Sequence, residues 1–112
     1  MVFKYYMLVD DCIVESDHGC APERIDRDHI YTSTVSTVFL ASEHVGGMFE
    51  TMIMGGPADG FMIRCETAKQ AREIHAQVTH ILKSINWLTY FLDGNASIKI
   101  FDLLNNIKKD SE

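Results

Sequence analysis

A change in the spacing of apolar residues near Thr67 constrains the fold of this chain more than any other feature. Before it, short runs of β-branched and aromatic residues alternate with turn residues, which is typical of strands. After it, apolar residues recur at intervals of three and four, which predicts a helix with one buried stripe. Strands followed by helices predict an α+β fold. We expect an antiparallel four- to five-stranded meander with a long helix packed on one face and a short C-terminal helix.

The strand-like runs are separated by polar segments. Asp10-Asp11 predicts a tight turn, and the polar segment 17–29, which contains a glycine and a proline, predicts a loop. Run 30–42 has apolar residues on both faces, so we expect a central strand covered on each side. The predicted strands span 3–9, 12–16, 30–42, 48–54 and 61–66.

The helical part begins with a capping signal. Thr67 followed by Gln70 matches the T-x-x-Q capping box. We expect the first helix to continue through Phe91 and to end at 93–95, and a second helix to span about 96–107. The buried stripe of the first helix comprises Ala71, Ile74, Val78, Ile81, Leu82 and Ile85.

Length and composition exclude several classes of protein. The 112 residues suit a single domain over 1–112. Ten basic against sixteen acidic residues, a net charge of −6, disfavour a nucleic-acid partner, because phosphate binding needs clustered Lys and Arg. We expect no membrane span, since no apolar run approaches ~20 residues. Three irregularly spaced cysteines indicate a reducing compartment, so we expect a cytoplasmic protein without disulfides.

His75 is the most informative single residue, because it falls on the apolar stripe of the first helix. One interpretation is a neutral, hydrogen-bonded core histidine. The other is a ligand contact or a general base that reaches through the sheet.

Further polar residues lie on the predicted strands and turns. Glu43-His44 places a carboxylate and an imidazole at a strand end, although neighbours on a strand point to opposite faces. Glu50 lies within an apolar strand, with Arg64 as its natural cross-strand partner. The expected ligand-binding residues are Thr37, Glu43, His44, Glu50, Thr51, Arg64 and His75.

Cysteine and histidine spacing does not predict a metal centre. Cys12, His18 and Cys20 are metal-binding residue types, but they form no C-x-x-C pair and no fourth ligand is evident. We therefore expect no metal and no cofactor.

Three stretches of the chain carry a family resemblance: S-T-V-F-L with Glu43-His44, F-E-T-M-I-M-G-G from Phe49, and an Arg64-Cys65-Glu66-Thr67 junction before His75. This order resembles a family of small, uncharacterised proteins encoded by bacteriophages and prophages. The likeness covers about 5–83, and 84–112 is a C-terminal helical extension. The chain departs from the family pattern in a shortened loop after the histidine and in Ile74, which replaces a glycine.

The resemblance implies a phage- or prophage-encoded accessory protein in the cytoplasm of the host. We expect a non-enzymatic binding module for a small ligand, such as a nucleotide signal, or for a host protein. One alternative is a small hydrolase that uses Glu43, His44 or Glu50 with His75; another is a purely structural oligomer. Apolar residues on the second face of the sheet, together with Trp87, Tyr90 and Phe91, predict a homo-oligomer.

Overall fold

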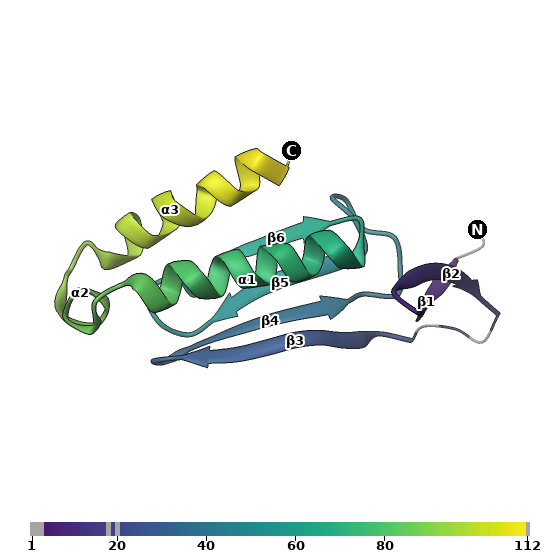
Figure 1. Cartoon of the computed structure of the whole chain (residues 1–112), viewed down its shortest axis with the longest axis horizontal. Helices are drawn as coiled ribbons and strands as arrows, with labels where there is room; N and C mark the ends of the chain where they lie inside the picture. Colours follow the sequence, from purple (N-terminus) through teal and green to yellow (C-terminus); the bar gives the residue numbers. More distant parts are fainter. Residues whose placement is uncertain (1–3, 18, 20, 112) are drawn as a thin grey trace.

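The computed structural model describes residues 4–17, 19 and 21–111, and this part of the chain has the predicted α+β fold. The molecule is elongated, with extents of 50 × 25 × 24 Å, and the long helix α1 runs along the sheet (Figure 1). Its elements are β1 (Tyr5–Val9), β2 (Cys12–Ser16), β3 (Glu23–Ile30), β4 (Ser33–Phe39), β5 (Phe49–Met54), β6 (Met62–Cys65), α1 (Ala68–Ser84), α2 (Trp87–Leu92) and α3 (Ala96–Ser111).

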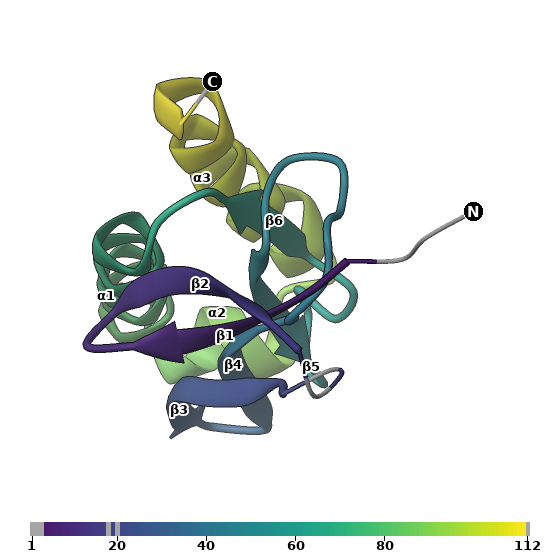
Figure 2. The same cartoon turned by 90° about the vertical axis from the view of Figure 1, so that its right-hand side faces the viewer.

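The main sheet is an antiparallel meander of four strands in the order β3-β4-β5-β6. The predicted Asp10-Asp11 turn joins β1 to β2, and both aspartates have positive φ angles of 50° and 63°. This hairpin forms a separate two-stranded sheet that lies across one end of the meander (Figure 2). A hydrogen bond of 2.8 Å from the Tyr6 N–H to the Ala41 carbonyl attaches it just beyond β4.

The expectation of a loop over 17–29 is wrong, because β3 occupies Glu23–Ile30. β3 lies at the edge of the sheet and pairs with β4 alone. Its side chains are mostly charged and exposed, so the strand lacks the apolar pattern that identifies a half-buried strand. Main-chain pairing with β4 stabilises the strand instead. The single predicted strand 30–42 is accordingly two strands, since a turn at Tyr31 (φ 54°) separates β3 from β4.

β4 is central in the sheet, as predicted, but only one of its faces is fully buried. Val35, Thr37 and Phe39 are 0% exposed and face α1. Ser36 and Val38, on the other face, stay partly exposed. The expected cover on each side is therefore not present in the single chain.

The N-cap at Thr67 and most of the buried stripe of α1 are confirmed, although Ile81 is only partly buried and Ile85 lies beyond the helix. The Gln70 side chain accepts from the Glu66 N–H and not from the cap residue. The Gln70 N–H donates to Thr67 Oγ1 at 3.1 Å, and Ala71, Ile74, Val78 and Leu82 are buried. The stripe packs against the sheet and holds the helix there by apolar burial.

The predicted continuous helix to Phe91 is wrong, because α1 ends at Ser84. Ile85 is extended (φ −82°, ψ 130°), and the Asn86 side chain caps a new helix, α2, by accepting from the Leu88 N–H. α3 packs against α1, places Phe101 against Phe61 and runs on to Ser111, beyond the predicted end. None of these helices is both long and apolar enough to cross a bilayer, as far as the described ranges extend.

Candidate functional site

A buried chain of hydrogen bonds joins α1 to the centre of the sheet. His75 is 2% exposed, and its Nδ1 lies 2.7 Å from Thr37 Oγ1. Thr37 Oγ1 lies 2.7 Å from Thr51 Oγ1 on β5, the residue directly opposite it in the strand register. The sequence predicts these three side chains as members of one ligand-binding set of seven, and the structure joins them directly. All are satisfied, as buried polar groups must be to avoid a large free-energy cost.

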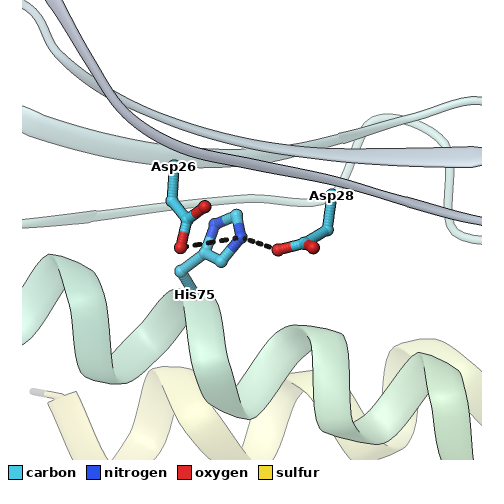
Figure 3. Close-up of side chains that lie close together, drawn as sticks. All are labelled: Asp26, Asp28 and His75. Carbon is cyan, nitrogen blue, oxygen red and sulfur yellow. Dashed lines mark hydrogen bonds and ion pairs between the residues drawn. The ribbon is translucent and has the colours of Figure 1, made fainter.

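The far side of the His75 ring faces two carboxylates that the sequence analysis missed. His75 Nε2 lies 2.7 Å from Asp28 Oδ2 and 3.6 Å from Asp26 Oδ2, and both aspartates reach down from β3 (Figure 3). Their side chains are 41% and 53% exposed, so the cluster opens to solvent between β3 and α1. The alternation Asp-Arg-Asp-His at 26–29 was the available signal, because it places the two aspartates on one face of a strand. Because a loop was predicted over 17–29, this alternation did not lead to a predicted site.

The order Asp28–His75–Thr37 matches the acid–base–hydroxyl order of nucleophilic catalysis. A nucleophile must reach its substrate, however, and Thr37 is 0% exposed beneath α1. The arrangement therefore orients the imidazole and does not present a reactive hydroxyl.

Glu50 and Arg64 form the predicted cross-strand pair, on the face of the sheet away from α1. Glu50 Oε2 lies 3.1 Å from both Arg64 Nε and Arg64 Nη2, and the two residues are directly opposite in the register. The pair is part-buried, at 14% and 26% exposure. Because side chains alternate along β5, Glu50 points away from Thr51 and from the His75 network.

Glu43 and His44 line a surface pocket of about 370 Å³ beyond the end of β4. Gly46, Gly47 and Met48 line it too, together with Glu66 from the residues that precede α1. Among these described lining residues the charged groups are two carboxylates, and no lysine or arginine is present. The pocket is therefore rich in hydrogen-bond acceptors.

Glu43 and His44 each form one further hydrogen bond at the edge of the pocket. The Tyr6 hydroxyl donates to Glu43 Oε1 at 2.9 Å, and this hydrogen bond raises the pKa of Tyr6 above its usual value. The His44 Nδ1–H donates to the Ser42 carbonyl at 2.9 Å, which fixes the orientation of the ring.

The described cysteines are free thiols: Cys12 is exposed and Cys65 is buried. His18 and Cys20, which the sequence analysis weighed with Cys12 as metal-binding types, lie outside the described residues. Burial raises the pKa of the Cys65 thiol to about 11.

In a Cys20→Ser background, we expect a thiol reagent at pH 8 to modify Cys12 quickly and Cys65 far more slowly. A pKa of about 11 leaves on the order of 0.1% of the Cys65 thiol as reactive thiolate at that pH. Because this pKa lies above the unfolded value of 9.0, its contribution to stability is complete below pH 9 and is lost as the pH rises through 11. The rates of disulfide exchange at Cys12 and Cys65, with and without urea, measure the difference in reactivity. Equal rates for both cysteines in the folded protein would contradict the prediction.

The seven expected ligand-binding residues therefore lie in three places. Thr37, Thr51 and His75 form the buried network; Glu50 and Arg64 pair on the opposite face; Glu43 and His44 line the pocket. The structure does not bring together the residues that the hydrolase alternative requires.

Comparison of the chain with protein-family models, with curated proteins and with solved structures finds no match.

Proposed function

We propose that the protein is a non-enzymatic binding module that holds a small ligand in the pocket beside Glu43 and His44. The observation that supports this proposal is the pocket itself, where two residues expected from the sequence meet Glu66 across the loop. The resemblance to phage and prophage proteins adds an accessory role in the cytoplasm of a bacterial host. The free thiols of Cys12 and Cys65 accord with such a reducing compartment.

The lining of the pocket favours a ligand that carries a positive charge. The carboxylates of Glu43 and Glu66 attract cations and accept hydrogen bonds. An ammonium or guanidinium group offers only donors, so it complements these acceptors. A nucleotide signal, which the family resemblance suggests, fits this pocket less well than a cation does, because its phosphates would face the two carboxylates.

Thermal unfolding with a panel of small amines, guanidines and nucleotides tests the proposal. A cationic ligand at tenfold excess over its Kd adds about 1.4 kcal/mol, which raises Tm by about 6 °C for a domain of this size. Glu43→Gln and Glu66→Gln should abolish the rise. Glu73→Gln, an exposed carboxylate on α1 outside the pocket, is the matched control and should keep it. A rise produced by nucleotides and not by amines would overturn the ligand class; no rise with either would overturn the small-ligand proposal.

A homo-oligomer and a host-protein partner stay predictions. Trp87 and Phe91 on α2 are 56% and 51% exposed, as self-association through this end of the molecule requires. Tyr90, the third residue expected there, is instead 3% exposed, and its hydroxyl contacts Ser33 and Thr32. Sedimentation velocity over a range of protein concentrations measures the oligomeric state.

A further inference from the structure

The cluster of Asp26, Asp28 and His75 brings three metal-binding groups to one point. Their ligand atoms all lie within 4.8 Å of one another, although β3 and α1 are far apart in the sequence. Asp26 and Asp28 point from alternate positions of one strand toward the helix, and His75 meets them from below (Figure 3). This cluster is separate from the proposed ligand pocket and shares no residue with it.

The distances suit an ion held between the helix and the strand. Two ligand atoms bound tetrahedrally at ~2.1 Å from an ion are about 3.4 Å apart, close to the 3.6 Å between His75 Nε2 and Asp26 Oδ2. Asp28 now bonds Nε2 directly at 2.7 Å. Its side chain is 41% exposed, so a small rotation admits an ion without disturbing the core.

The groups behind His75 hold it in the orientation that a metal ligand needs. Metal-binding histidines usually donate their second ring N–H to a fixed acceptor, which sets the tautomer and the ring plane. Thr37 Oγ1 is placed to accept from Nδ1–H at 2.7 Å, and Thr51 accepts in turn from Thr37. Without a metal ion, Nε2–H donates to Asp28 Oδ2. A bound ion would take the place of this proton, so the Nε2 lone pair and the carboxylate would both face the ion.

We propose that Asp26, Asp28 and His75 bind a divalent transition-metal ion such as Zn²⁺, with water completing the coordination. An imidazole nitrogen with two carboxylates suits Zn²⁺, Co²⁺ or Ni²⁺, whereas Mg²⁺ and Ca²⁺ prefer all-oxygen sites. Residue spacing along the chain does not predict this site, because His75 lies far from Asp26 and Asp28 in the sequence. The fold assembles these from elements that pair only in the tertiary structure.

Isothermal titration of the untagged, chelator-treated protein with ZnCl₂ tests the proposal. We expect one saturable site per chain, a tenfold or greater loss of affinity in Asp26→Asn and Asp28→Asn, and no displacement by MgCl₂. Asp26→Asn keeps the side-chain oxygen that accepts the Arg27 N–H, so the fold should be unaffected. Glu23→Gln makes the same charge change on β3 outside the cluster and should leave the affinity within twofold. Glu43→Gln should also leave it unchanged, so the zinc site and the ligand pocket succeed or fail independently.

Titration with Co²⁺ identifies the ligands by their absorption. Imidazole and carboxylate ligands give only weak visible bands, whereas binding at Cys12 or Cys20 adds an intense thiolate charge-transfer band in the near ultraviolet. Wild type that binds no zinc, variants that bind as tightly as wild type, or a thiolate band would each overturn the proposal. In those cases the three side chains form only a hydrogen-bonded cluster between β3 and α1.

Discussion

Thr37→Val should lower the free energy of unfolding by about 2–4 kcal/mol. The valine matches threonine in shape but leaves His75 Nδ1 and the Thr51 hydroxyl without their shared partner in the core. A buried polar group that loses its partner costs roughly 1–3 kcal/mol. Urea denaturation followed by circular dichroism measures the difference.

Thr34→Val is the matched control, because Thr34 is on the same strand but on the partly exposed face, where its hydroxyl bonds the exposed His29. We expect its cost to stay below about 1 kcal/mol. Equal costs at the two positions would contradict the importance of the buried network.

The triple variant Thr37→Val/Thr51→Val/His75→Leu separates stability from function. Replacing all the buried partners with apolar groups of similar shape is often nearly neutral, so we expect its stability to approach wild type. It should nevertheless have lost the zinc site. Such a result would show that the polar network of Thr37, Thr51 and His75 serves zinc binding and is not needed for stability.

Gly47→Ala should be the most destabilising single substitution at the ligand pocket. Gly47 has a φ of +124°, and a Cβ there would lie 2.0 Å from the Cys65 carbonyl oxygen. The clash is with backbone, which cannot rotate away, and it adds to the strain of a positive φ. We expect a loss of about 3 kcal/mol or more, which corresponds to a fall in Tm of about 13 °C or more.

Gly60→Ala separates the two contributions. Gly60 also has a positive φ, +90°, but its Cβ would meet nothing within 4 Å. This variant should show only the conformational strain, about 1 kcal/mol. Similar losses of Tm in the two variants, measured by scanning calorimetry, would show that the contact with β6 does not exist in solution.

The parts of the fold that follow from local pattern were predictable. The cap at Thr67, the stripe of α1 and the pairing of Glu50 with Arg64 all depend on residues a few positions apart or on the period of a strand. The inward position of His75 followed from the same periodicity. The break at Ile85 did not, because the apolar pattern continues through it although α1 ends at Ser84 and Asn86 begins α2.

The candidate sites depended on contacts between distant segments. The sequence by itself determined which side chains of α1 face inward, because the helical period sets that directly. Only the tertiary structure decided that Asp26 and Asp28 lie over His75, since β3 is an edge strand whose pairing with β4, and not its own composition, makes it a strand. An edge strand with charged faces has no apolar pattern that predicts a strand. The sequence therefore shows the two aspartates but does not predict that they lie close to His75.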